Sequence, residues 1–209
     1  MHFFDIGHIA FTIMGYPVSF VELIGTLFGL ISVWFASRAN ILTWGTGIVN
    51  EVFLFILFFQ VQLYADMFLQ VYFFVVTIYG WYNWKAKPDA GSITVLNSKQ
   101  RWLTGIVILA SSVIAGFLIQ NIHRYLPQYF KIQAAYPYTD SFVMVLSIVA
   151  IVLLAMKKIE NWVLWILTDA ICVVLYIKKG VYFLSLEYFI FFGLASYGLY
   201  QWKKQMAHG

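Results

Sequence analysis

Long apolar runs separated by short polar segments dominate this chain. Several of the runs approach or exceed the roughly 20 residues that a helix needs to cross the hydrocarbon core of a membrane. We predict seven membrane-spanning helices, which cover residues 18–36, 41–60, 64–84, 102–120, 139–156, 161–177 and 181–202. Residues 1–17 mix polar and apolar positions and are expected to form a short helix at the membrane interface. Residues 203–209 would be a cytoplasmic tail.

The composition agrees with an all-α integral membrane protein. Hydrophobic residues make up 62% of the 209 residues and charged residues 11%, whereas soluble domains average about 45–50% and 25%. Too few residues lie between the runs for a sizeable soluble domain. The formal net charge of +4 comes from basic residues in short loops. It therefore indicates contact with the lipid bilayer, and no nucleic-acid partner is expected.

The basic residues also predict an orientation, because cytoplasmic loops of membrane proteins are enriched in Lys and Arg. With the N-terminus outside, nine of the thirteen basic residues are cytoplasmic: Arg38, Lys85, Lys87, Lys99, Arg101, Lys157, Lys158, Lys203 and Lys204. The external segments then hold Arg124, Lys131, Lys178 and Lys179. This distribution favours an external N-terminus and a cytoplasmic C-terminus.

An internal repeat relates the first three predicted helices, residues 18–84, to the last three, residues 139–202. Sliding the chain by 118 positions places Trp44 on Trp162, Tyr79-Gly80 on Tyr197-Gly198, Trp84-Lys85 on Trp202-Lys203, and Glu51 on Asp169. The block 85–138, with the helix 102–120, inverts the chain once more between the repeats. The sequence thus predicts a 3+1+3 arrangement of parallel repeats, and transporters of this kind bind substrate between the repeats near the middle of the membrane.

Candidate site residues begin with a stripe on the helix 161–177. Trp162, Trp165 and Asp169 follow each other at steps of 3 and 4 residues, and Tyr176 continues the stripe. An acid inside a membrane span is costly and is a functional candidate by default. Glu51 and Glu187 are also embedded in predicted helices. Each of these acids could be protonated, hydrogen-bonded to a polar neighbour, or matched by a cationic ligand.

Aromatic and amide residues complete the predicted substrate site. Trp162 could equally belong to the interfacial aromatic belt, whereas Trp165 lies one turn deeper. The aromatic residues at other helix ends are expected in that belt: Trp81, Tyr82, Trp84, Trp102, Tyr200 and Trp202. The full predicted set is Trp44, Asn50, Glu51, Gln70, Gln120, Trp162, Trp165, Asp169, Tyr176, Glu187 and Tyr188. For the amide at the helix end, Gln120, ordinary solvation is the competing interpretation.

The sequence carries no signature of an enzyme. It has no nucleophile elbow, no His/Cys spacing for a metal and no glycine-rich phosphate loop, so no cofactor or metal is expected. A retinal protein would need a lysine within its last helix, whereas Lys203 and Lys204 lie only at its end.

Four stretches carry a resemblance to a known family: residues 44–50, residues 79–85, the Asn161/Trp162/Trp165/Asp169 spacing, and residues 197–202. In these stretches the chain resembles the PnuC family of nicotinamide riboside transporters, and the resemblance extends over residues 16–204. It implies a SWEET-like fold, a homotrimer in the bacterial inner membrane and facilitated diffusion of nicotinamide riboside. A cytoplasmic nicotinamide riboside kinase would then trap the substrate by phosphorylation.

The residues agree with that substrate on chemical grounds. An acidic and aromatic site without basic residues suits a cationic pyridinium ring, and amides suit the carboxamide and the ribose hydroxyls. The phosphate of a mononucleotide would find no intramembrane Lys or Arg, so we expect the site to exclude it. Related carriers of thiamine or riboflavin, a proton-coupled carrier, and a receptor that binds without transport remain alternatives.

Overall fold

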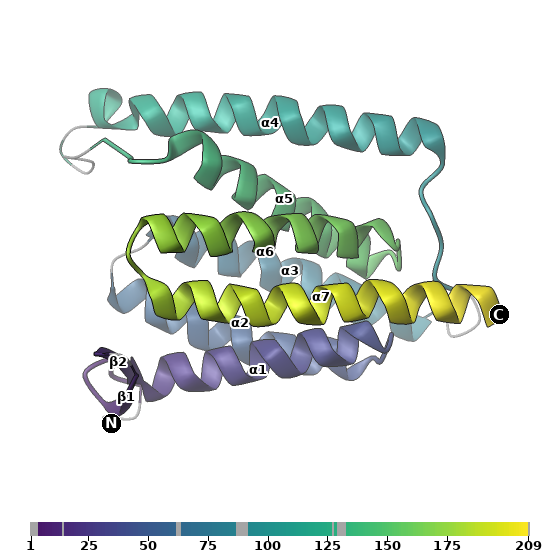
Figure 1. The fold of residues 1–209 in the computed structure, drawn as a ribbon, viewed down its shortest axis with the longest axis horizontal. Helices are drawn as coiled ribbons and strands as arrows, with labels where there is room; N and C mark the ends of the chain where they lie inside the picture. Colours follow the sequence, from purple (N-terminus) through teal and green to yellow (C-terminus); the bar gives the residue numbers. More distant parts are fainter. Residues whose placement is uncertain are drawn as a thin grey trace.

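The computed structural model describes residues 4–13, 15–61, 64–86, 92–126, 128 and 133–208. Helices make up most of this part of the chain (Figure 1). They are α1 (Phe20–Ser37), α2 (Leu42–Gln60), α3 (Tyr64–Ala86), α4 (Ser98–Tyr125), α5 (Pro137–Ala155), α6 (Glu160–Lys178) and α7 (Tyr182–His208). All seven predicted helices are present. Six of them, all except α3, are long and apolar enough to cross a membrane.

Two helices are longer than their apolar runs. α4 begins four residues before the predicted Trp102, because Asn97 and Gln100 form a capping box in which each side chain bonds the other's backbone N–H. α7 does not end at Trp202 but continues to His208. The expected tail at 203–209 is thus mostly helical, because Lys, Gln, Met and Ala favour helix as polar residues replace apolar ones.

The predicted interfacial helix at the N-terminus is wrong. Strands β1 (Ile9–Ile13) and β2 (Tyr16–Ser19) pair there as an antiparallel hairpin. Gly15 adopts a positive φ of 83° between the strands, a conformation that costs glycine little. Contacts distant in the chain hold the segment, since the Gln60 side chain accepts from Ile6 N–H and donates to the Phe4 carbonyl.

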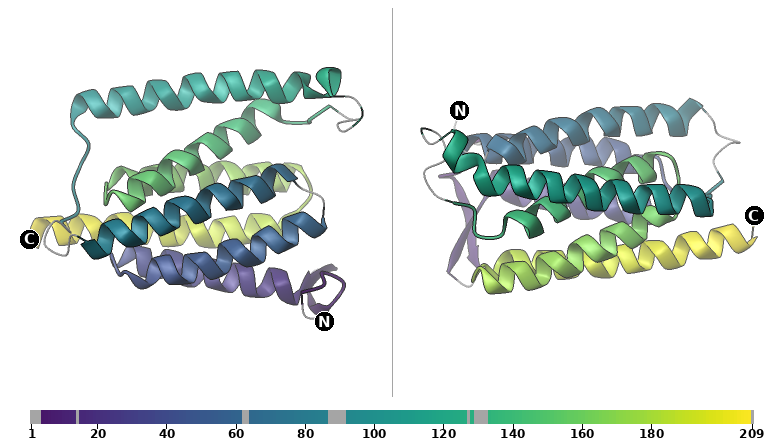
Figure 2. Two further views of the ribbon diagram at one scale, coloured as in Figure 1. Left: turned by 180° about the vertical axis from the view of Figure 1, so that it is seen from behind. Right: turned by 90° about the horizontal axis from the view of Figure 1, so that it is seen from above.

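Six helices close into a ring. Contacts run from α1 to α2, α3, α5, α6, α7 and back to α1, whereas α4 packs on α5 outside the ring. Figures 1 and 2 show this arrangement from three sides. In the order around the ring, α2 stands opposite α6. The N-terminal hairpin lies at one end of the bundle and the C-terminus at the other.

Four tryptophans form the main core at the end of the bundle that carries the C-terminus. Trp44 packs edge-on against Trp84 at a ring distance of 5.1 Å, and Trp162 packs edge-on against Trp202 at 5.6 Å. Trp84 and Trp202 also contact each other, which joins the two pairs. All four are buried. α3 can lie close to Trp44 of α2 because Gly80 has no side chain at that point. In the same way, Gly198 lets α7 lie close to Trp162 of α6.

The outer tryptophans of these pairs fasten one half of the ring to the other. Trp84 Nε1 on α3 donates to the carbonyl of Ala155 on α5 at 3.1 Å, and Trp202 Nε1 on α7 donates to the carbonyl of Ala36 on α1 at 2.9 Å. We expected both tryptophans in the interfacial belt. That prediction is wrong, because both indole groups are buried in the core between the helices. Trp102, in contrast, is 76% exposed, as a belt residue would be.

Replacing Trp202 with phenylalanine should destabilise the protein. The variant keeps an aromatic ring but removes the Nε1 donor, and a hydrogen bond of this kind contributes about 0.5–1.5 kcal/mol. The Ala36 carbonyl keeps its second donor, Ala39 N–H at 2.9 Å. Thermal unfolding in detergent measures the effect, and Trp102→Phe on the exposed face of α4 is the matched control. Equal melting temperatures for the two variants would contradict the proposed role of this bond.

Candidate functional site

Two acids stand at the midpoints of opposite helices. Glu51 is the central residue of α2 and Asp169 is the central residue of α6. Both are nearly inaccessible, with exposed fractions of 5% and 4%. The interior of the ring is therefore acidic halfway along its length.

Glu51 is held from the neighbouring helix. The hydroxyl of Thr77 on α3 donates to Glu51 Oε1, whereas Glu51 Oε2 is buried and has no hydrogen-bond partner among the described residues. Gln70, on the same α3, is also buried and leaves its Oε1 without a described partner. This side of the ring thus offers two unsatisfied acceptor oxygens to a ligand with N–H or O–H groups.

Asp169 is buried at the centre of α6. No described residue donates a hydrogen bond to its carboxylate or forms an ion pair with it. Two turns further along α6, Tyr176 stacks on Tyr188 of α7, with ring centroids 5.3 Å apart and an interplanar angle of 10°. Trp165, one turn before Asp169, is half-buried against the tryptophan core. This arrangement suits a flat, positively charged group.

Two further predicted residues bridge α1 to its neighbours. Asn50 on α2 donates through Nδ2 to the Gly25 carbonyl at 2.8 Å. Glu187 on α7 accepts from the hydroxyl of Thr26 at 3.2 Å. Both therefore have partners in this conformation, and their free acceptor oxygens are what a ligand could still use.

Three predicted site residues do not join the others. Gln120 lies on α4, outside the ring, and accepts from the hydroxyl of Tyr138 on α5 at 3.0 Å. Trp44 and Trp162 are each 1% exposed and packed on a glycine of the adjacent helix. Their rings are part of the core rather than walls of an open site, because the helices close directly over them.

Sequence reasoning missed the threonines Thr77 and Thr26, which hold Glu51 and Glu187. A threonine within an apolar helix gives no signal by itself, because it can bond its own helix backbone instead. The hydroxyl of Tyr16 in the hairpin was also missed. It donates to Glu22 Oε1 at 2.9 Å while its ring stacks on Phe183 of α7 at 5.3 Å. Burial and the nearby carboxylate raise the pKa of Tyr16 to about 12, so it remains a neutral donor at physiological pH.

Charged pairs in the described part of the chain lie at the ends of the helices. Arg101 pairs with Glu160 at 2.9 Å, and Lys179 pairs with Asp140 at 3.1 Å. The described residues contain no group of His, Cys, Asp and Glu that could hold a metal. Lys179 Nζ also lies 5.5 Å from the ring centroid of Tyr176. The described mid-helix positions of the ring offer a ligand carboxylates, amides and aromatic faces, and no basic side chain.

Comparisons with known proteins identify the family of this chain. Residues 19–204 match the family described as nicotinamide mononucleotide transporter. The nicotinamide riboside transporter PnuC of Escherichia coli is 34% identical, over 93% of this chain and 90% of its own length. The riboflavin/roseoflavin transporter RibM of Streptomyces davaonensis is 24% identical, over 92% and 89%.

A solved structure shares the fold. The crystal structure of the vitamin B3 transporter PnuC superposes with a TM-score of 0.66 at 21% identity, over 90% of this chain and 82% of that chain. The family match, the E. coli relative and the apolar helices confirm the resemblance seen in the sequence. The chain is a multi-pass membrane protein that belongs to the nicotinamide mononucleotide transporter family.

Proposed function

We propose that this protein transports nicotinamide riboside across the membrane by facilitated diffusion. The observation that carries the proposal is a pair of buried acids at mid-helix on opposite sides of the ring, with no basic partner among the described residues. A relative named as a nicotinamide riboside transporter at 34% identity supports the substrate. Asp169, Trp165, Tyr176 and Tyr188 would receive the cationic ring, and Glu51, Asn50 and Gln70 the carboxamide and ribose.

The riboside is favoured over the mononucleotide despite the family's description. A phosphate brought into the ring would meet Glu51, Asp169 and Glu187, and burying it without a cation is strongly unfavourable. Removing the phosphate leaves a net positive charge on the ligand, which these acids attract. Uptake of the riboside without uptake of the mononucleotide is the expected selectivity.

We further propose the parallel 3+1+3 architecture, with α3 as the seventh span. The bounds of α2, Leu42–Gln60, shifted by 118 positions give those of α6, Glu160–Lys178. The loops before them match as well, since Ala39 and Lys157, also 118 positions apart, both have φ of 51°. The contact of α1 with α7 corresponds in this scheme to that of α5 with α3.

This pseudo-symmetry supports a transport mechanism. The two three-helix bundles, α1–α3 and α5–α7, meet mainly through the α1–α7 and α3–α5 contacts, and Trp84 on α3 also touches Trp202 on α7. Rocking of one bundle against the other would open the central site to either side in turn. The hydrogen bonds of Trp84 and Trp202 fasten the bundles at one end, so they would have to break when that end opens.

Transport should not respond to a proton gradient. In proteoliposomes, we expect uptake of labelled nicotinamide riboside to equilibrate at equal concentrations inside and outside, with or without an imposed pH difference. Counterflow driven by unlabelled substrate should be observed, which a receptor without transport activity would not give. Accumulation that follows the pH difference would contradict uniport and assign Asp169 or Glu51 to a proton relay.

Other vitamins of similar shape are the second candidate substrates. The relative at 24% identity is named as a riboflavin/roseoflavin transporter, and thiamine, like nicotinamide riboside, carries a cationic aromatic ring. Competition by each compound in the same uptake assay separates these substrates. The proposal includes a homotrimer in the bacterial inner membrane with the N-terminus outside, and a cytoplasmic kinase that phosphorylates the transported riboside.

A further inference from the structure

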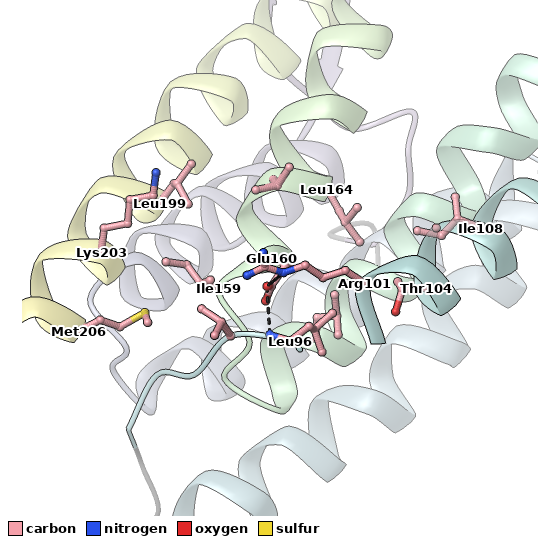
Figure 3. Close-up of a pocket in the computed structure, with 14 residues that line it drawn as sticks. Leu96, Arg101, Thr104, Ile108, Ile159, Glu160, Leu164, Leu199, Lys203 and Met206 are labelled. Carbon is pink, nitrogen blue, oxygen red and sulfur yellow. Dashed lines mark hydrogen bonds and ion pairs between the residues drawn. The ribbon is translucent and has the colours of Figure 1, made fainter. Parts of the chain in front are cut away.

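A cavity of about 560 Å³ lies outside the ring, at the end of the bundle that carries the C-terminus. It is bounded by the start of α4, the segment before it, the start of α6 and the last turns of α7 (Figure 3). It shares no residue with the predicted substrate site. Its size is within the range of about 300–1,000 Å³ typical of small-molecule pockets.

The geometry of α4 explains this cavity. α4 packs on α5 and lies outside the ring, so the adjoining faces of α6 and α7 are left partly uncovered at this end. The walls are mainly apolar and include Ile108, Leu153, Leu164 and Leu199. A hydrocarbon-lined space of this size at the edge of a membrane protein is filled by hydrocarbon, since water finds too few polar partners there.

Two cations and one acid stand among these apolar walls. Arg101 Nε is held by Glu160 Oε1 at 2.9 Å, and the same oxygen accepts from Leu96 N–H at 3.0 Å. The terminal nitrogens of Arg101 and the ammonium of Lys203 have no described partner. Glu160 Oε2 is buried and also lacks a described partner. The cavity lining thus has a net positive charge together with one acceptor for a hydroxyl.

We infer that this cavity is a binding site for an anionic phospholipid. The lipid phosphate would pair with Arg101 and Lys203, a headgroup hydroxyl would donate to Glu160, and an acyl chain would occupy the apolar space. Basic pockets between helices near a membrane surface bind lipid headgroups in this way. Trp102, exposed on α4 next to Arg101, places this level at the membrane interface, where tryptophan is enriched.

The test uses the purified full-length protein in detergent. Its thermal unfolding is measured with phosphatidylglycerol, with phosphatidylcholine and with inorganic phosphate. We expect phosphatidylglycerol to raise the melting temperature more than phosphatidylcholine, and phosphate to leave it unchanged. In Lys203→Gln, phosphatidylglycerol should raise the melting temperature no more than phosphatidylcholine does. Lys204→Gln removes the same charge one position further and should keep the larger rise with phosphatidylglycerol.

A cavity-filling variant tests the acyl-chain part independently. A side chain on Gly105, which lines the cavity, would meet nothing within 4 Å of its Cβ, so Gly105→Leu can fill the space without displacing neighbours. It should remove the lipid-induced rise. The matched control is Gly193→Leu, another open helical position that does not line the cavity. The lipid-induced shift is the readout, so a change in basal stability does not affect the comparison.

Several outcomes would overturn the inference. Equal shifts from both lipids, or a full shift retained in Lys203→Gln and Gly105→Leu, would show that the lipids act elsewhere. Protection by phosphate alone would make the site one for a free anion. A changed particle mass in Gly105→Leu with an unaltered lipid response would show that a second copy of the chain covers the cavity. If Gly105→Leu does not fold, the comparison of Lys203→Gln with Lys204→Gln decides.

Discussion

Gly80→Ala and Gly198→Ala should each destabilise the protein strongly. A Cβ on Gly198 would lie 2.7 Å from three atoms of the Trp162 ring, and one on Gly80 would lie 2.4–2.6 Å from the Trp44 ring. Both rings are buried and wedged against a second tryptophan, so they cannot move aside. Overpacking of this kind costs about 1–3 kcal/mol of folding stability. We expect a cost near the upper value, because the tryptophan rings are rigid.

The measurement is the melting temperature of each variant in detergent. Gly193→Ala is the matched control, because a Cβ there meets nothing within 4 Å. The double variant Gly198→Ala with Trp162→Leu should lose less stability than the sum of the two single variants, because the smaller side chain leaves room for the methyl group. A Gly198→Ala protein as stable as Gly193→Ala would show that the two helices do not approach as described.

Trp165→Ala and Asp169→Asn should each weaken the binding of nicotinamide riboside at least tenfold. The first removes the aromatic face, whose attraction for a cation reaches about 2 kcal/mol when desolvated, and tenfold corresponds to about 1.4 kcal/mol. The second keeps the shape of the side chain but removes the charge that the proposal pairs with the ring. Titration calorimetry on the purified variants measures both effects.

Two controls connect these losses to the proposed site. Trp165→Phe keeps an aromatic face and should retain most of the affinity. Gln120→Ala removes an amide that lies on α4 and bonds Tyr138, outside the ring, so its affinity should match the unmodified protein. If Gln120→Ala weakened binding as much as Asp169→Asn, the site would have to be moved from the ring to α4.

The sequence predicted the parts of the fold that depend on pattern along the chain. Apolar runs gave the helices, and the expected span 161–177 differs from α6 by one residue at each end. The identity of Trp44 with Trp162 and of Gly80 with Gly198 anticipated equivalent packing, which the structure shows as two edge-on tryptophan pairs. Glu51 and Asp169 are buried at mid-helix, as expected of embedded acids.

Features that depend on which face of a helix meets another helix could not be predicted. In helices apolar on all sides, periodicity does not distinguish lipid from core, so Trp202 and Trp102 looked alike although one is 0% and the other 76% exposed. The place of Gln120 outside the ring depends on how α4 packs, for which the sequence has no signal. The segment before the hairpin is bonded at Phe4 and Ile6 to the distant Gln60, and local propensity contains no trace of that contact.

The most direct test of the central claim is calorimetric binding of nicotinamide riboside to the purified protein, with the mononucleotide, thiamine and riboflavin measured alongside. We predict saturable binding of the riboside and no binding of the mononucleotide, because the described mid-helix positions of the ring hold acids and no basic side chain to pair with a phosphate. Equal or tighter binding of the mononucleotide would contradict the account of the site. Binding of riboflavin or thiamine in place of the riboside would contradict the substrate and leave the fold unaffected.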